Sequence, residues 1–171
     1  MSPPLRIAIV GYGKMGKRID AIAQERGHEV VARLGKDDDL RQLIAQAPSV
    51  VIEFTSPEAA MFNFEALLNM NLPVVTGTTG WLDEQDTVRQ LTENHNGSFL
   101  WGSNFSIGVN VMFQLNRRLA ELMNGHDQYD PFVEERHHRY KKDSPSGTAR
   151  TIAEDIVERL ERKTSFVLSD A

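Results

Sequence analysis

Residues 5–16 read LRIAIVGYGKMG, in which an apolar run leads directly into the glycine pattern GxGxxG. The apolar run is typical of a buried strand, and residues 14–26 are expected to form a helix with Gly27 as its C-terminal cap. Between a strand and a helix, the first glycine allows a tight turn, the second lets the backbone approach a pyrophosphate, and the third lets the helix pack closely on the strand. A ligand-free glycine turn is the alternative, and the flanking strand and helix disfavour it. The predicted cofactor-binding residues of this turn are Gly11, Tyr12, Gly13, Lys14, Met15 and Gly16.

Further short apolar runs predict more strands, and the amphipathic stretches between them predict helices. One helix has a clear start, because Ser56 suits the N-cap position and Pro57 the first helical position. Apolar residues over 107–122 repeat mostly every four positions and predict another helix. The predicted strands are 5–10, 30–34, 50–54, 73–76 and 98–101. This alternation favours an α/β fold with a Rossmann-like parallel sheet and helices on both faces.

The alternation breaks at residues 125–131, where a turn containing proline and aspartate leads into a strand-like stretch at 132–135. After it, the pattern predicts a helix with apolar positions between Ala149 and Leu160, and a short strand at 165–168. We therefore expect residues 1–126 to form a dinucleotide-binding Rossmann domain. Residues 127–171 are expected to begin a second, α+β substrate domain.

The composition excludes several classes of function. With a formal charge of -5, the chain lacks the net basic character of most nucleic-acid-binding proteins. It has no cysteine, so disulfides, thiolate metal ligands and a cysteine nucleophile are excluded. No apolar run is long enough to span a bilayer, and the run at 5–10 is too short for a signal peptide. A cytoplasmic location, without membrane or nucleic-acid partners, is the expectation.

The end of the second predicted strand bears on the choice of cofactor. The GxGxxG pattern is usually followed by an acidic residue here, which holds the ribose 2′-hydroxyl of NADH. This chain has Lys36 instead, and a lysine suits the 2′-phosphate of NADPH. Lys36 is alternatively a solvated turn residue, with Asp37 in the role of the acid. Arg33 is a second candidate for the 2′-phosphate, although strand alternation turns its side chain away. The cofactor is therefore expected to be NADPH or NADH.

Two further loops follow the fourth and fifth predicted strands. Ligands of an open parallel sheet bind beyond the carboxyl ends of its strands, which is where a nicotinamide would lie. Each loop alone is better explained as a turn, but three such loops on one edge, with GxGxxG, favour a cofactor site. The predicted residues are Gly77, Thr78, Thr79, Gly102, Ser103, Asn104 and Phe105.

Residues 134–149 read EERHHRYKKDSPSGTA and concentrate positive charge in an acidic chain. In an extended segment His137 and His138 would point to opposite sides, so only one of them would face the cofactor as a proton donor or acceptor. Lys141 adds a positive charge and a proton source. Such a cluster predicts a site for a small, multiply charged anion.

The same segment ends at the start of a predicted helix. Ser146 suits the N-cap, and the N–H groups of Gly147 and Thr148 would open the helix as a carboxylate site. A solvated basic loop before an ordinary helix is the alternative. A His-His metal site is disfavoured because no further ligands are apparent, so no metal is predicted.

The segment 134–149 resembles the E-x-HHxxKxDxPSGTA signature of the 4-hydroxy-tetrahydrodipicolinate reductase family, long called dihydrodipicolinate reductases. Four other stretches resemble family motifs in the same order, so the resemblance covers essentially the whole chain. They are VGYGKMGKRI, VVIEFTSPEA, VVTGTTGW and SNFSIGVNVM.

The resemblance implies NADPH- or NADH-dependent reduction of a cyclic dicarboxylate on the diaminopimelate and lysine route. It implies that His137 is the proton donor or acceptor, Lys141 the proton donor, and His138 a substrate contact. Gly147 and Thr148 would cradle a substrate carboxylate, while the loops at 77–79 and 102–105 would line the nicotinamide site.

Two departures from the family accompany the resemblance. Gly35 stands where many members have an acid, which bears on the NADH or NADPH preference. Members also continue through more strands of a mixed sheet and a closing helix, so the second domain is expected to be truncated here. Family members assemble as homotetramers through that sheet. The alternatives are a related NAD(P)-dependent dehydrogenase of amino-acid pathways and a nucleotide-binding module without catalysis.

Overall fold

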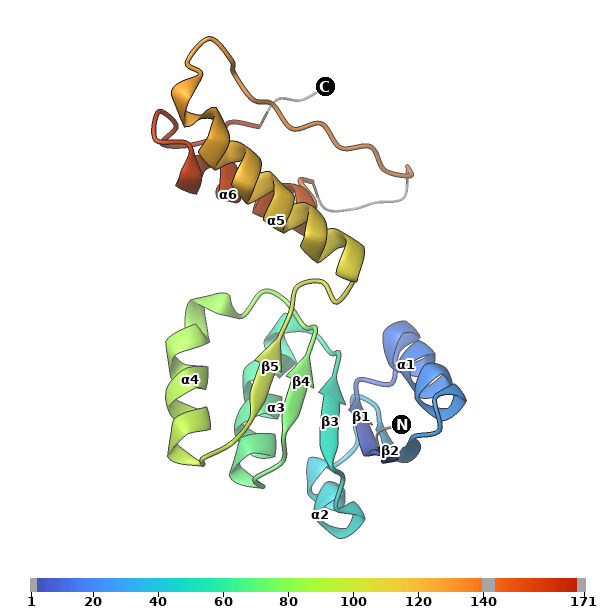
Figure 1. Cartoon of the computed structure of the whole chain (residues 1–171). Helices are drawn as coiled ribbons and strands as arrows, with labels where there is room; N and C mark the ends of the chain where they lie inside the picture. The colour runs from blue at the N-terminus through green and yellow to red at the C-terminus, as the bar shows by residue number, and fades with distance from the viewer. Residues whose placement is uncertain (1–2, 140–143, 169–171) are drawn as a thin grey trace. The chain divides into compact units, whose positions relative to one another are not determined.

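The computed structural model describes residues 3–139 and 144–168, and its largest element is a five-stranded parallel sheet (Figure 1). The strand order is β2-β1-β3-β4-β5. β2 is therefore added on one side of β1 and β3 to β5 on the other, which puts the topological switch point between β1 and β3. All five strands lie where the apolar runs predicted them. Their bounds are β1 Arg6–Val10, β2 Glu29–Leu34, β3 Val50–Glu53, β4 Val74–Thr76 and β5 Phe99–Trp101. The Rossmann-like prediction is confirmed, and ligands of such sheets bind beside this switch point.

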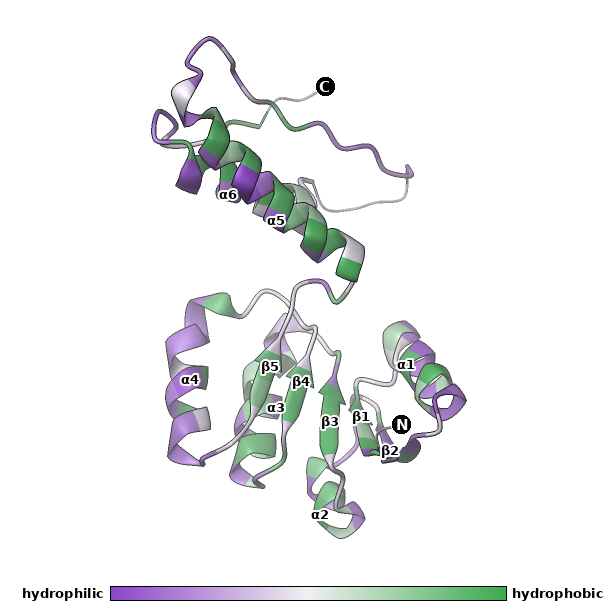
Figure 2. Ribbon diagram, in the orientation of Figure 1, coloured by the Kyte–Doolittle hydropathy of each residue, from purple (hydrophilic) through white to green (hydrophobic). Residues whose placement is uncertain are grey.

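Helices cover both faces of the sheet because the side chains of each strand alternate between the faces. Ile7 and Ile9 of β1 pack with Ala23 of α1, whereas Ala8 and Val10 belong to the larger core that contains α3. Figure 2 shows the strands in green for hydrophobic residues. The helices of this part are α1 Lys14–Glu25, α2 Leu43–Gln46, α3 Pro57–Asn69 and α4 Gln85–Asn94, with 3-10 turns η1 Leu40–Gln42 and η2 Leu82–Glu84.

The ends of α1 and α3 follow their predicted signals. After α1, Gly27 has φ +78° and donates its N–H to Gln24 O at 2.9 Å, and His28 N donates to Ala23 O at 2.9 Å. This pair of bonds is the Schellman motif that a glycine permits. At the start of α3, Ser56 is the N-cap and Pro57 the first helical residue, as predicted.

Four aromatic rings form the centre of the larger core. Phe64 of α3 is fully buried and meets Trp81 and Phe99 edge to face, with ring centroids 5.0 and 4.9 Å apart. Trp81 in turn meets Trp101 at 5.9 Å. Edge-to-face pairs of this kind add about 0.5–1.5 kcal/mol each beyond the burial of their area. The cluster therefore anchors α3 and the loop after β4 against β5.

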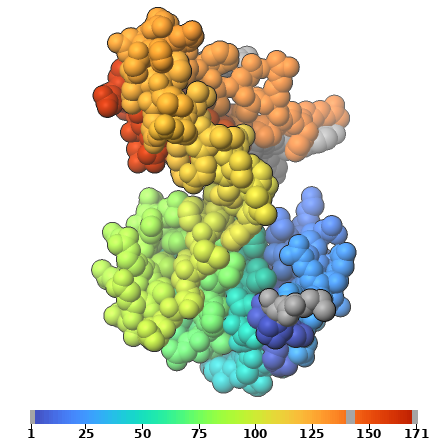
Figure 3. All heavy atoms as spheres, viewed as in Figure 1, coloured from blue at the N-terminus to red at the C-terminus, as the bar shows by residue number. Residues whose placement is uncertain are grey.

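The chain separates into two compact units, Met1–Ser103 and Asn104–Ala171 (Figure 3). The second unit pairs α5 Ile107–Leu122 with α6 Gly147–Arg159, and the 3-10 turn η3 Met123–Gly125 follows α5. The two helices run in the same direction, because Asn116 Nδ2 bonds Ile152 O and Asn124 Nδ2 bonds Arg159 O. An ion pair between Arg117 and Asp155 at 2.8 Å lies between these contacts.

The division between the units lies upstream of the predicted boundary at 126/127. The predicted scheme assigned the helix at 107–122 to the first domain by its position in the alternation. In the structure, α5 packs on α6 and belongs to the second unit. A pattern of apolar residues shows that a helix has a buried face, but it does not show which element covers that face.

The two strands predicted after residue 131 are not found. Among the described residues of the second unit, none belongs to a strand, and Phe132 and Val167 are 85% and 90% exposed. A strand requires a neighbouring strand to satisfy its backbone hydrogen bonds, and apolar alternation does not supply one. The expected mixed sheet is therefore absent from residues 104–139 and 144–168.

We predict that Phe64→Ala lowers the free energy of unfolding of the first unit by about 3–5 kcal/mol, because it leaves a cavity beside the rings of Trp81 and Phe99. Urea unfolding followed by tryptophan fluorescence measures this, since both tryptophans lie in the cluster. Phe62→Ala on the same helix is the control, because Phe62 is 71% exposed and its loss should cost less than about 1 kcal/mol. Equal effects of the two substitutions would contradict the assignment of the core.

Candidate functional site

The GxGxxG turn brings β1, β2 and α1 together. Gly11 has φ +93°, a conformation that disfavours any side chain, and a Cβ there would collide with Phe54 O. A Cβ on Gly16 would collide with the carbonyl of Gly11, so the third glycine permits the close contact of helix and strand. Leu34 O accepts from Gly11 N at 2.9 Å and from Tyr12 N at 3.0 Å, which ties the turn to the end of β2.

Gly13 differs from the other two glycines of the pattern. A Cβ added to it would meet nothing within 4 Å, and its φ of -84° permits any residue. It is the N-cap of α1, without a side-chain cap hydrogen bond and without an acidic residue in the first turn. This leaves a helix start with backbone N–H donors beside open space, which fits the pyrophosphate of a dinucleotide.

A buried carboxylate supports the turn from α1. Asp20 is 6% exposed and accepts from Arg33 Nε at 2.7 Å, Arg33 Nη2 at 2.8 Å and Tyr12 Oη at 2.5 Å. The hydrogen bond from Arg33 is the main cause that lowers the pKa of Asp20 to about 2, and the bond to Asp20 raises the pKa of Tyr12. The guanidinium of Arg33 therefore positions Tyr12 through Asp20. The sequence did not single out Asp20, since an acid within a helix is usually solvated.

The end of β2 carries charges of both signs. Lys36 is exposed, as its proposed contact with a 2′-phosphate requires. The carboxylate that reaches this strand end is that of Asp38, whose Oδ2 accepts from Gly35 N at 2.7 Å. Asp37 was the acid considered from the sequence. In the structure the contact with the strand end is made by Asp38, because the turn brings its carboxylate back to the N–H of Gly35, three residues earlier.

The ends of β3 and β4 are joined by one buried side chain, Glu53, which is fully buried. Its Oε1 accepts from Thr55 Oγ1, and from Asn63 Nδ2 at 3.3 Å. Its Oε2 accepts from Thr76 Oγ1 at 2.5 Å and from Thr78 Oγ1 at 2.8 Å. The carboxylate thus gathers donors from β4, α3 and the loops after both strands.

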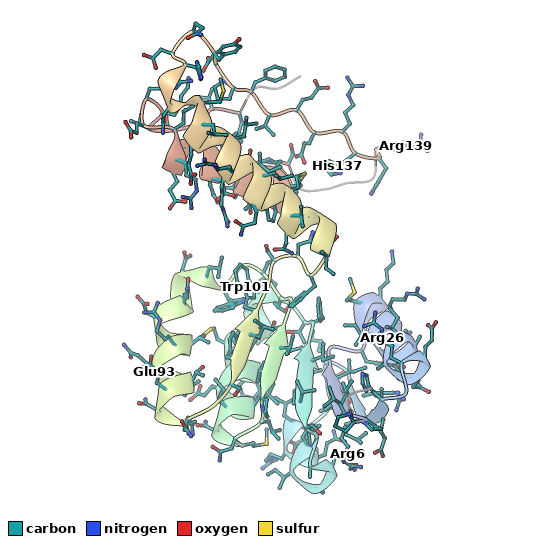
Figure 4. All side chains as sticks on the ribbon, viewed as in Figure 1. Arg6, Arg26, Glu93, Trp101, His137 and Arg139 are labelled. Atoms are coloured by element: carbon teal, nitrogen blue, oxygen red, sulfur yellow. The ribbon has the colours of Figure 1, made fainter. Side chains whose placement is uncertain are left out.

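Thr78 lies in the predicted nicotinamide loop, and its N–H, hydroxyl and carbonyl groups all form hydrogen bonds. Its N–H donates to Thr76 Oγ1 at 3.0 Å, and its hydroxyl also accepts from Thr55 N at 2.8 Å. Its carbonyl accepts from the indoles of Trp81 at 2.8 Å and Trp101 at 3.0 Å (Trp101 is labelled in Figure 4). Thr78 is only 5% exposed, and these bonds hold the loop in its shape.

The other predicted residues of this edge have separate positions. Gly77 is half-buried, and a Cβ on it would collide with the ring of Phe54, whereas Thr79 is exposed. Gly102 N continues the strand pairing by donating to Thr76 O at 3.2 Å. Of the loop 102–105, Gly102 and Ser103 lie in the first unit, and Asn104 and Phe105 lie in the second.

In the second unit, Glu135 joins the histidine segment to the start of α6. Its carboxylate accepts from Ser146 N at 2.7 Å, from Ser146 Oγ at 2.5 Å, and pairs with His137 Nε2 at 2.7 Å (His137 is labelled in Figure 4). The hydroxyl of Ser146 is the main cause that lowers the pKa of Glu135 to about 2. Glu135 therefore stays ionised at neutral pH and fixes the imidazole of His137. Its place two residues before His137 was the only sequence signal for it.

The start of α6 has the form that the sequence predicted. Ser146 is the N-cap, and its Oγ accepts from Ala149 N at 3.1 Å. Gly147 is exposed, Thr148 is half-buried, and a Cβ on Gly147 would meet nothing within 4 Å. His138 is exposed on the preceding segment. Lys141 lies outside the described residues.

Within residues 3–139 and 144–168, no three His, Asp or Glu side chains gather closely enough to hold a metal ion. Over the same ranges, no helix is long and apolar enough to cross a membrane.

The parallel sheet and the open glycine turn at its carboxyl edge are those of a dinucleotide-binding protein. Family models described as dihydrodipicolinate reductase, N-terminus and C-terminus, match residues 5–105 and 108–167. The chain therefore belongs to the dihydrodipicolinate reductase family, whose members are NAD(P)H-dependent, and the family predicted from its motifs is confirmed.

Individual relatives agree with the family models. The 4-hydroxy-tetrahydrodipicolinate reductase of Christiangramia forsetii is 41% identical over 98% of this chain and 70% of its own length. That of Syntrophus aciditrophicus is 36% identical over 92% of this chain and 66% of its own length. The chain thus spans about two thirds of these curated relatives. A solved, dipicolinate-bound dihydrodipicolinate reductase from Paenisporosarcina sp. TG-14 matches with a TM-score of 0.73 and 28% identity, over 99% of this chain and 71% of that one.

We predict that Asp20→Asn lowers the free energy of unfolding by about 1–2 kcal/mol at pH 7, because Arg33 loses its charged partner. The pKa of Asp20 is lowered in the folded state, so the stabilisation is present above about pH 4 and is lost as the pH falls toward about 2. Urea titrations from pH 7 to pH 2.5 should therefore show the parent and the variant converging.

The control for this substitution is Glu29→Gln, which breaks an ion pair with Arg6 that is exposed on both sides. We expect it to change the free energy of unfolding by no more than about 0.5 kcal/mol. A constant difference between Asp20→Asn and the parent across the whole pH range would show that the charge of Asp20 is not the cause.

Proposed function

We propose that this chain is an NAD(P)H-dependent 4-hydroxy-tetrahydrodipicolinate reductase, which acts by way of dihydrodipicolinate to give tetrahydrodipicolinate in diaminopimelate and lysine biosynthesis. The observation that carries the proposal is the contact of one carboxylate, Glu135, with both His137 and the N-cap of α6. Glu135 thereby keeps the proposed proton donor or acceptor, His137, next to the proposed anion site at the start of α6. The names of the relatives and their coverage of this chain support the substrate.

The first unit is proposed to bind the cofactor, which supplies a hydride when bound. Gly13 and the start of α1 would hold the pyrophosphate. The loop at 77–79 and residues Gly102 and Ser103 would line the nicotinamide site, and the resemblance adds Asn104 and Phe105, which begin the second unit. Lys36 favours NADPH, and Asp38 offers a carboxylate at the same strand end, so both nucleotides are candidates.

The second unit is proposed to bind the dicarboxylate and to deliver protons. Addition of hydride to C4 of the ring sends electrons toward the ring nitrogen and C3, and protons must meet them there. His137 would be the proton donor or acceptor and Lys141 the proton donor, with His138 as a substrate contact. The N–H groups of Gly147 and Thr148 would hold a substrate carboxylate, since the first N–H groups of a helix have no intrahelical acceptor.

The assembly and location proposed for the protein follow the family resemblance. We propose a homotetramer in the cytoplasm, with a small dicarboxylate as the only further partner. The bound dipicolinate of the Paenisporosarcina reductase supports a dicarboxylate ligand.

We predict that Gly13→Ala raises the dissociation constants of NADPH and NADH by at least roughly tenfold, because the added methyl group fills the space that the pyrophosphate would occupy. Stability should change little, since a Cβ on Gly13 meets no atom within 4 Å. Titration of nucleotide fluorescence measures the affinity. Gly125→Ala, whose Cβ also meets open space, is the control and should leave affinity unchanged. Unchanged binding by Gly13→Ala would remove this glycine from the cofactor site.

We predict that His137→Ala and Lys141→Ala each lower kcat by at least roughly 100-fold, because a proton donor is lost, while the affinity for NADPH changes less than about twofold. The assay follows NADPH and NADH oxidation with substrate generated in situ. Arg136→Ala is the control, because Arg136 is exposed and pairs with Glu134.

Two outcomes would contradict parts of the proposal. Turnover that is indifferent to His137→Ala and Lys141→Ala would refute the assigned roles. Tight cofactor binding by the parent chain without any turnover would favour a nucleotide-binding module over a reductase.

A further inference from the structure

Glu53 is a buried charge-bearing group that the proposed chemistry does not use. It lies at the carboxyl end of β3, fully buried, and receives four hydrogen bonds from side chains. Within residues 3–139 and 144–168, no arginine, lysine or histidine forms an ion pair with it. A buried carboxylate without a cation is costly, so its presence calls for a physical reason.

The hydrogen bonds around Glu53 show which protonation state they accommodate. The hydroxyls of Thr76 and Thr78 accept from backbone N–H groups, and that of Thr55 accepts from Asn63 Nδ2. Each hydroxyl has one proton, and in each case it is directed at an oxygen of Glu53. With Asn63 Nδ2, four donors face the carboxyl group. A protonated carboxyl would set its own O–H against one of these donors, so the arrangement fits the anion.

This anion lies directly behind the loop proposed to line the nicotinamide. The Thr78 hydroxyl bonds Glu53 Oε2 at 2.8 Å, and Gly77 N bonds the backbone carbonyl of Glu53 at 3.2 Å. Glu53 is fully buried, and its carboxylate is surrounded by the side chains of Thr55, Asn63, Thr76 and Thr78 instead of water. A charge in such a setting is screened less than one at the surface.

Loss of hydride converts the neutral reduced nicotinamide into a cationic ring. We propose that Glu53 is a positioning residue whose buried negative charge, acting through the Thr78 loop, makes the cofactor site favour the oxidised, cationic nicotinamide over the reduced one. The inference rests on the proposed cofactor function of this edge. It gives the buried carboxylate a role in hydride donation, because a site that stabilises the oxidised cofactor lowers the cost of giving up the hydride.

The test compares four dissociation constants, for NADPH, NADP⁺, NADH and NAD⁺, in the parent chain and in Glu53→Gln. The amide has the size of the carboxylate and lacks its charge. We expect the ratio of the oxidised to the reduced dissociation constant to rise by about 3- to 15-fold, as Coulomb attraction over roughly 10 Å at an effective dielectric constant of about 20 implies. A merely structural role would weaken both redox forms alike.

Glu53→Asp is the matched variant, since it shortens the side chain and keeps the charge. We expect it to weaken all four nucleotides together, with the ratio within about twofold of the parent. If Glu53→Gln does not fold, as judged by its fluorescence unfolding transition, Asn63→Lys replaces it. The ammonium of the new lysine, on α3, would lie beside Glu53 Oε1 and neutralise its charge. The same rise in the ratio of the oxidised to the reduced dissociation constant is expected.

The outcomes separate this inference from the proposed function. A folded charge-removing variant with a ratio within about twofold of the parent overturns the inference. A parent chain that binds none of the four nucleotides instead overturns the proposed cofactor function of the edge itself.

Discussion

The carboxyl edge of the sheet depends on the buried carboxylate of Glu53, which joins the ends of β3 and β4. A parallel sheet aligns the ends of its strands but leaves the loops beyond them free to vary. Glu53 removes that freedom, because its oxygens take hydroxyl donors from Thr55, Thr76 and Thr78 at once. The two indoles on the Thr78 carbonyl complete the constraint from the aromatic core. The loop after β4 is therefore held in place by buried side chains.

Carboxylates perform the same task at two other places in the chain. Asp20 accepts from both Tyr12 of the GxGxxG turn and Arg33, and Glu135 holds His137 and Ser146. In both cases an ionised acid receives donors from more than one segment of the chain. Hydrogen bonds to ionised acceptors are shorter and stronger than neutral ones, so a few of them suffice to order a loop. Neither Asp20 nor Glu53 was singled out from the sequence, because an acid with scattered donors has no spacing of its own, and Glu135 was marked only by its place before His137 in the motif.

The elements of the first unit could be predicted because their signals are local. Five apolar runs became five strands, and Gly27 and Ser56 ended and began helices where their backbone preferences required. Prediction failed where a partner was needed. The stretch 132–135 alternates like a strand without pairing as one, and α5 packs on α6 rather than joining the first domain. The roles of His137, His138 and Lys141 came from a motif, and they stay predictions.

The sequence by itself determined the class of fold, the glycine turn, the capped start of α6 and the family. Each of these is read from short segments whose signals are local, because backbone conformation, amphipathic period and capping act between near neighbours in the chain. Only the tertiary structure decided which acid supports which loop, that Arg33 pairs with Asp20, and that Thr78 is buried beneath its own loop. Those contacts join residues brought together by sheet order and helix packing, which a linear pattern does not specify.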